Sequence, residues 1–141
     1  FPLLRIIVDG EEIYHGRGLA FVGNISRYAV GLRICRDAKL EDGLLDLVVF
    51  PCKEQTSLIL HATWTLLRLH PLKGGVLYRR AKNIRIESDH PVPCQVDGDV
   101  GPNTPLDISI AKGRLNLIAP LIPHGLKISW WPWEWKGSDI L

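Results

Sequence analysis

The sequence has 141 residues, of which 46% are hydrophobic and 23% are charged. This composition is typical of one globular domain with its own core and excludes a disordered tail. The net charge of +2 is too small to indicate nucleic-acid binding, and no apolar run reaches the roughly 18 residues that a membrane-spanning helix needs. Because the sequence begins at Phe1 and contains no Met, we expect it to be a piece of a longer protein.

Alternating apolar and polar residues predict β-strands along most of the chain. The first hairpin is expected within residues 3–13, because an Asp9-Gly10 pair between apolar runs is a strong hairpin signal. A further, separate strand is expected at residues 18–25. The nearly continuous apolar run over residues 44–50 predicts a buried central strand.

One segment predicts a long helix. Within residues 53–69, apolar side chains recur at helical intervals, and prolines lie on either side at Pro51 and Pro71. We therefore expect one principal helix over about residues 53–69.

Strand patterns resume at residues 83–88, 92–97 and 106–119. Many short strands at spacings of about 8–12 residues are typical of antiparallel sandwiches and barrels. The predicted fold is mainly β, an antiparallel β-sandwich with one principal α-helix, over residues 1–125.

The cysteines and histidines indicate no structural metal site. Cys35, Cys52 and Cys94 are odd in number and form no Cys-x-x-Cys pair. The five histidines show neither His-x-x-His nor His-x-x-x-His spacing. We expect reduced thiols in a reducing, cytoplasmic compartment.

Residues 126–141 form a tryptophan-rich tail that includes Trp130, Trp131 and Trp133. Two interpretations stay open. The tail is either a final strand that packs on this or another domain, or an anchor in the lipid headgroup zone, which tryptophan favours.

A basic segment precedes the strand at residues 83–88 and extends into it, with Arg79, Arg80, Lys82 and Arg85 around one tyrosine. The simpler interpretation is a solvated sheet face. The alternative is contact with anionic lipid headgroups, where each basic side chain adds about 1 kcal/mol. With the tail, the segment predicts peripheral membrane contact.

Two Asp-Gly turns carry the acids of chemical interest, at Asp42-Gly43 and at Asp97-Gly98-Asp99. A loop that combines a carboxylate with backbone carbonyls can bind a hard cation such as Mg²⁺ or Ca²⁺. A carboxylate projected from a tight turn can act as a general base. From the residues alone, a plain turn is the simpler interpretation of both motifs.

The two motifs, AKLEDGLLD at residues 38–46 and QVDGD at residues 95–99, lie about 55 residues apart within a layout of strands, helix and strands. This order resembles the C-terminal domain of the diacylglycerol kinase-like lipid kinases, a family that includes the sphingosine and ceramide kinases. The resemblance covers residues 5–120.

The resemblance implies a two-domain parent protein. In the family, an N-terminal domain with a Gly-Gly-Asp-Gly-Thr loop binds ATP; the sequence contains no such loop, so we expect the nucleotide domain to lie outside it. The resemblance also implies that Asp99 takes the proton from the lipid hydroxyl, a position where bacterial members commonly carry Glu. It further implies a Mg²⁺ ion bound by the Asp42 carboxylate and the main-chain carbonyls of Lys39 and Leu44.

The resulting hypothesis is the substrate-side domain of an ATP-dependent kinase that phosphorylates a lipid hydroxyl, such as that of diacylglycerol. The isolated chain is then expected to be inactive. The alternative hypothesis is a non-catalytic β-sandwich that binds lipid or a membrane surface. An exposed strand edge would also permit a homodimer.

Overall fold

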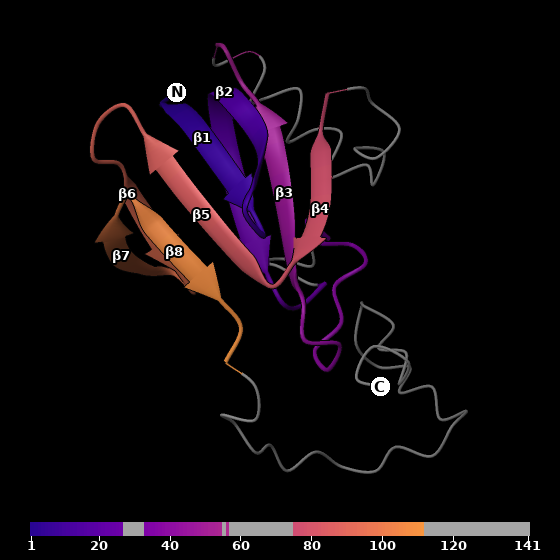
Figure 1. Ribbon diagram of the computed structural model, residues 1–141. Helices are drawn as coiled ribbons and strands as arrows, with labels where there is room; N and C mark the ends of the chain where they lie inside the picture. The colour runs from indigo at the N-terminus through magenta and orange to yellow at the C-terminus, as the bar shows by residue number, and fades with distance from the viewer. Residues whose placement is uncertain (27–32, 55, 57–74, 112–141) are drawn as a thin grey trace, which may run out of the picture.

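The computed structural model describes residues 1–26, 33–54, 56 and 75–111 (Figure 1). Six strands of this part form one antiparallel sheet in the order β4-β3-β2-β1-β5-β8, and β6 and β7 form a separate hairpin. Figure 1 shows this hairpin beside β8, at the edge of the sheet opposite to β4. The strands are β1 (Leu3–Val8), β2 (Glu11–Gly23), β3 (Leu45–Pro51), β4 (Leu77–Ala81), β5 (Asn83–Ser88), β6 (Pro93–Val96), β7 (Asp99–Asn103) and β8 (Leu106–Ser109).

The first hairpin forms where the sequence predicts it. Asp9 and Gly10 connect β1 to β2, and both have positive φ angles, of 48° and 94°. Such angles are tolerated by aspartate and are easily adopted by glycine. The Asp9 carboxylate also accepts hydrogen bonds from the backbone amides of Lys82 and Asn83, at 3.3 and 2.9 Å. The turn is thereby tied to the connection between β4 and β5.

The second strand is longer than predicted. The sequence predicts separate strands on either side of residue 17, whereas the structure has one strand of 13 residues, β2. β2 pairs with β1 up to Arg17 and with β3 from Gly18 onward. A Cβ at Gly18 would stand 2.5 Å from the carbonyl oxygen of Phe50, so this position excludes a side chain. Because the pairing partner changes at this point, one unbroken strand serves both halves of the sheet.

β3 is the buried central strand that the sequence predicts. Leu45–Phe50 are all buried. On one face of β3, Leu45, Leu47 and Val49 belong to the larger core, with residues of β1 and β5. On the other face, Val48 and Phe50 belong to a second cluster, with Ile34 and Cys35. Both faces are therefore covered by apolar groups, which explains the continuous apolar run.

The predicted helix over residues 53–69 falls almost entirely on residues 55 and 57–74, which lie outside the described residues. Of the described residues in this segment, Lys53 and Glu54 form a bend and Thr56 is helical, while every element with described bounds is a strand. The strand predicted near residues 115–119 and the tail at 126–141 also lie outside them. Within the described ranges, no helix is long and apolar enough to cross a membrane.

The three cysteines are free thiols, as predicted. Cys35 and Cys52 are buried and Cys94 is half-buried. Burial raises the pKa of the Cys35 thiol to about 11, so this thiol is protonated at neutral pH and serves as a packing group.

Candidate functional site

The Asp97-Gly98 pair forms a two-residue turn between β6 and β7. Both residues have positive φ angles, of 51° and 103°, as a type I′ hairpin turn requires. Asp99 is the first residue of β7 and pairs with Val96. Of the two acids in this motif, Asp97 therefore forms the turn, and Asp99 lies directly beside it.

The Asp99 side chain is exposed. An open pocket of about 330 Å³ lies elsewhere, at the β1–β2 turn, and is lined by residues that include Ile7, Asp9, Asn83 and Asp107. Arg85 of the predicted basic segment lines this pocket, whereas Asp99, Asp42 and the other described candidates do not. The described residues place Asp99 on an open surface, so its catalytic role stays a prediction.

The base of the β6–β7 hairpin is held by Thr104, which is 9% exposed. Its hydroxyl accepts a hydrogen bond from the amide of Val92, and its own amide donates to the carbonyl of Val92, both at 2.9 Å. The hydroxyl also contacts that of Ser88 at the end of β5. Because the hairpin does not pair with the six-stranded sheet, these contacts orient it. No sequence motif pointed to Thr104.

The hairpin also presents apolar side chains to solvent. Val100 is 92% exposed and Val96 is 53% exposed. Val96 on β6 is paired with Asp99, and Val100 is the residue after Asp99 on β7. The candidate acid therefore has two exposed valines as its neighbours, one across the hairpin and one beside it on β7.

The second predicted site is the loop at residues 39–44. The Asp42 carboxylate accepts a hydrogen bond from the backbone amide of Leu44, at 2.9 Å, and Gly43 adopts a positive φ of 70°. The carbonyl oxygens of Lys39 and Leu44 both lie within hydrogen-bond distance of the side-chain amide of Asn24, at 3.3 and 3.0 Å. The two carbonyls predicted as ligands thus contact the same side chain, that of Asn24. The sequence analysis did not identify Asn24.

Arg80 lies at this loop and forms an ion pair with Asp42. Its Nε also lies 3.7 Å from Oδ1 of Asp46. The sequence left Arg80 either on a solvated sheet face or in contact with anionic headgroups. The structure pairs it with these two acids, and its lipid contact stays a prediction. Arg79 and Lys82, which belong to the same basic segment, are exposed, while Trp130, Trp131 and Trp133 lie outside the described residues.

Asp46 is completely buried, at 0% exposure. Its Oδ1 accepts a hydrogen bond from the hydroxyl of Tyr78, while its Oδ2 has no partner among the described residues. Burial raises the pKa of the Asp46 carboxyl group, and the hydrogen bond from Tyr78 opposes this shift. Burial and the same hydrogen bond raise the pKa of Tyr78. A single acid within the apolar run of residues 44–50 was the sequence signal for this pair.

Among the described residues, no three His, Cys, Asp or Glu side chains gather as potential metal ligands. A cation at the 39–44 loop would therefore depend on backbone carbonyls in addition to one carboxylate. Oxygen ligands of this kind are those that Mg²⁺ and Ca²⁺ prefer, so the residues present fit a hard cation and not zinc.

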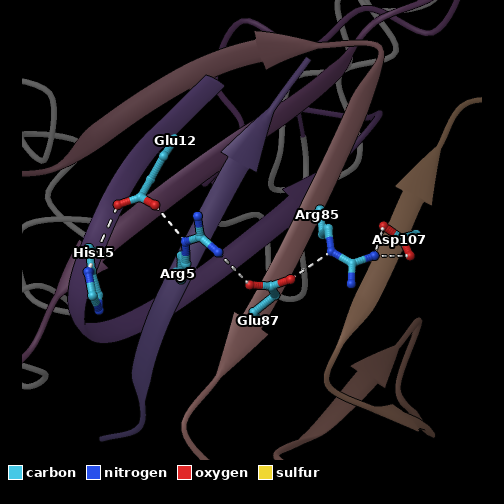
Figure 2. A network of polar contacts seen from close by, with 6 residues as sticks. All are labelled: Arg5, Glu12, His15, Arg85, Glu87 and Asp107. Atoms are coloured by element: carbon cyan, nitrogen blue, oxygen red, sulfur yellow. Dashed lines mark hydrogen bonds and ion pairs between the residues drawn. The ribbon is translucent and has the colours of Figure 1, made fainter. Parts of the chain in front are cut away.

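A third cluster of charges covers one face of the sheet (Figure 2). Arg5 contacts Glu12 at 2.5 Å and Glu87 at 3.2 Å, and Arg85 contacts Glu87 at 2.8 Å and Asp107 at 2.7 Å. These side chains come from β1, β2, β5 and β8 and alternate in sign across the strands. The side chains are partly to largely exposed, from 30% for Glu87 to 71% for Asp107, and exposed ion pairs of this kind contribute little to stability. We interpret the cluster as the solvent-facing side of the sheet.

Known proteins resemble this chain over most of its length. The family model described as the YegS C-terminal NAD kinase beta sandwich-like domain matches residues 3–119. A diacylglycerol kinase of Mycobacterium tuberculosis (strain CDC 1551 / Oshkosh) is 32% identical over 117 residues, which cover 82% of this chain and 38% of the relative. A diacylglycerol kinase of Staphylococcus carnosus (strain TM300) is 26% identical over 118 residues, covering 83% of this chain and 38% of the relative.

The fold also matches a solved structure, that of a provisionally assigned diacylglycerol kinase from Bacillus anthracis str. Sterne. The TM-score is 0.63 at 26% identity, covering 77% of this chain and 35% of the other. This chain thus spans less than two-fifths of the length of these relatives. The match confirms the predicted resemblance, and the description of the family agrees with the predicted sandwich: the chain belongs to the YegS C-terminal domain family of the diacylglycerol kinase-like proteins.

Proposed function

We propose that this chain is the lipid-side domain of an ATP-dependent lipid kinase that phosphorylates a hydroxyl group such as that of diacylglycerol. The observation that carries the proposal is the 32% identity with a diacylglycerol kinase over 117 residues. The part of that relative beyond the match leaves room for an ATP-binding domain. The chain by itself is expected to be inactive, so ATP-dependent lipid phosphorylation by the 141-residue chain alone would contradict the proposal.

In the proposed reaction, Asp99 acts as the general base. Its carboxylate takes the proton of the lipid hydroxyl while the hydroxyl oxygen bonds to the γ-phosphorus of ATP. The bond from that phosphorus to the bridging oxygen breaks, and ADP leaves. Its exposed position beside a tight turn supports this role, because an ATP-binding domain can then close over the hairpin and form the cleft.

The 39–44 loop is the proposed Mg²⁺ site. The Asp42 carboxylate and the carbonyls of Lys39 and Leu44 would hold the ion, which supplies positive charge near the transferred phosphate. The contacts of Asn24 with both carbonyls support this proposal, since they show two oxygens converging on one point. Arg80 would then release Asp42 and keep its second contact, with Asp46.

Replacement of Asp42 by Asn tests the Mg²⁺ site. In the full-length protein, we expect Asp42→Asn to weaken the apparent Mg²⁺ affinity of lipid kinase turnover by at least about tenfold, because one charged oxygen ligand is lost. Asp37→Asn is the matched control, since Asp37 lies in the same segment and is exposed, with an ion pair to Arg36. An unchanged Mg²⁺ dependence in Asp42→Asn would remove this loop from metal binding.

We also propose that the hairpin contacts the lipid surface through Val100 and Val96. Burial of an exposed valine is worth about 1.5 kcal/mol, roughly a tenfold change in partitioning. Val100→Asp is therefore expected to reduce co-sedimentation of the protein with anionic phospholipid vesicles by at least about tenfold. Asn103→Asp adds the same charge elsewhere on β7. This control variant should change co-sedimentation with the vesicles by less than twofold. Equal sedimentation of the two variants would contradict contact through the hairpin and would shift attention to the basic segment and the tryptophans.

Two further expectations remain proposals. A cytoplasmic protein with peripheral membrane association agrees with the free thiols and the exposed valines. A homodimer would need a free strand edge, and β4 and β8 are the edge strands of the described sheet.

A further inference from the structure

The side-chain amide of Asn24 lies between two backbone acceptors. The amide atom that faces the loop lies 3.3 Å from the carbonyl oxygen of Lys39 and 3.0 Å from that of Leu44. If this atom is nitrogen, it donates a hydrogen bond to each carbonyl. If it is oxygen, three oxygens face one another, and only a cation between them makes that arrangement favourable. A half-turn of the planar amide group exchanges the two atoms. The other end of the amide faces only donors, so the orientation with oxygen toward the loop loses hydrogen bonds there, and a bound cation has to offset that loss.

The spacing of these atoms suits both occupants. Distances of 3.0 and 3.3 Å are ordinary for an amide donor and a carbonyl acceptor. Neighbouring oxygens around an octahedral Mg²⁺ ion with bonds of about 2.1 Å are also about 3.0 Å apart. Each of the two carbonyl oxygens therefore already lies at ligand spacing from the Asn24 amide atom, so this atom can join either carbonyl as a ligand with little movement of the backbone.

We infer that Asn24 is a two-state ligand of the loop. Without a cation, its Nδ2 donates to the carbonyls of Lys39 and Leu44 and holds them together. With Mg²⁺ bound, the amide turns and its Oδ1 joins these carbonyls and Asp42 as a ligand. The inference rests on the proposed Mg²⁺ site and adds to it a ligand on the segment that follows β2, 15 or more residues away from the loop in the sequence.

The surrounding charges allow this exchange. In the cation-free loop, Arg80 neutralises Asp42. When the cation takes over that role, Arg80 has a second carboxylate within reach in Asp46, 3.7 Å away, and one oxygen of Asp46 has no partner in the described part of the chain. No buried charge is then left unpaired in either state.

Asparagine is the residue that can serve both states. Aspartate offers oxygen only, so Asn24→Asp would repel the two carbonyls in the empty loop but add a charged ligand for the cation. We expect Asn24→Asp to lower the melting temperature without Mg²⁺ and to tighten Mg²⁺ binding about tenfold. Asn24→Ala offers neither atom and should weaken binding about tenfold. Asn103→Asp, which adds the same charge on exposed β7, should leave Mg²⁺ affinity within twofold of the native value.

The decisive measurement is made on the native chain, by ¹⁵N NMR during titration with MgCl₂. The side-chain NH₂ signals of Asn24 are assigned by their loss in Asn24→Asp. We expect these signals to move, and their protons to exchange faster with water, in step with the backbone amides of Gly43 and Leu44. NH₂ signals that stay unchanged while those backbone amides respond would show that Asn24 only braces the loop, and would overturn the inference.

Two other outcomes would also overturn it. One is Mg²⁺ binding by Asn24→Asp that is no tighter than that of the native chain. The other is the absence of any Mg²⁺ response at Gly43 and Leu44, which would remove the cation site itself. Neither result would decide the proposed kinase activity, since that is measured by turnover of the full-length protein and the Asp99 variant.

Discussion

Asp99→Asn is expected to lower lipid kinase turnover of the full-length protein by about 10²–10⁴-fold. The substitution keeps the size and shape of the side chain but removes its ability to accept the hydroxyl proton. Because Asp99 is exposed at the start of β7, the free energy of unfolding should change by less than about 0.5 kcal/mol. Turnover is measured with saturating ATP and a short-chain diacylglycerol, and stability by urea denaturation.

Asp97→Asn is the matched control for this experiment. It makes the same chemical change two residues away, in the turn itself. Asn adopts the positive φ of 51° that Asp97 has, so the hairpin should form normally. We expect its turnover to stay within about threefold of the native value. Similar turnover in both variants, whether high or low, would remove the specific role of Asp99 as the base.

Asp46→Ala is expected to lower the free energy of unfolding by about 3 kcal/mol. The substitution leaves the Tyr78 hydroxyl and the Nε of Arg80 without the acid that they contact, and it opens space beside β3. Asp37→Ala is the control, since Asp37 is exposed and its ion pair with Arg36 lies at the surface, where such pairs contribute little. Urea denaturation of both variants measures the difference. Equal effects would mean that the buried acid contributes no more than a surface charge.

The pH dependence of stability gives a second measurement at Asp46. Burial raises the pKa of this carboxyl group above its ordinary value of 3.8 in the folded chain, so the folded state binds the proton more tightly than the unfolded state. Stability then increases as the pH falls from neutral toward 3.8. The amide of Asp46→Asn does not titrate. As the pH falls from neutral toward 3.8, the free energy of unfolding of the native chain should therefore rise relative to that of Asp46→Asn. A constant difference would contradict the raised pKa.

Local patterns predicted β1, β3, β5, β6 and β8, because each depends on residues close in the sequence, whereas β4 and β7 lie outside the predicted strands. The Asp9-Gly10 and Asp97-Gly98 pairs supply the positive φ angles of tight turns, and alternation determines which face of β5 is buried. The apolar run of residues 44–50 predicted a strand covered on both sides, which β3 is.

The length of β2 was not predictable from such patterns. Residues 16–18 contain two glycines, which suggest a break between strands. The structure instead continues β2 through Gly18, because the backbone of β3 comes too close there for any side chain. The glycine thus reflects a contact with Phe50 of β3, which lies 32 residues later in the sequence, and not a turn.

For the candidate site, the sequence determined which groups are available: an acid beside a tight turn at Asp99, and the acid and carbonyls of the 39–44 loop. Only the tertiary structure decided which groups meet. Asn24 comes to that loop from the end of β2, Arg80 from β4 and Asp46 from β3. The strand pairings place these residues, which are far apart in the chain, side by side. The physical reason is that side-chain alternation is a property of one strand, whereas a ligand set depends on the register between several.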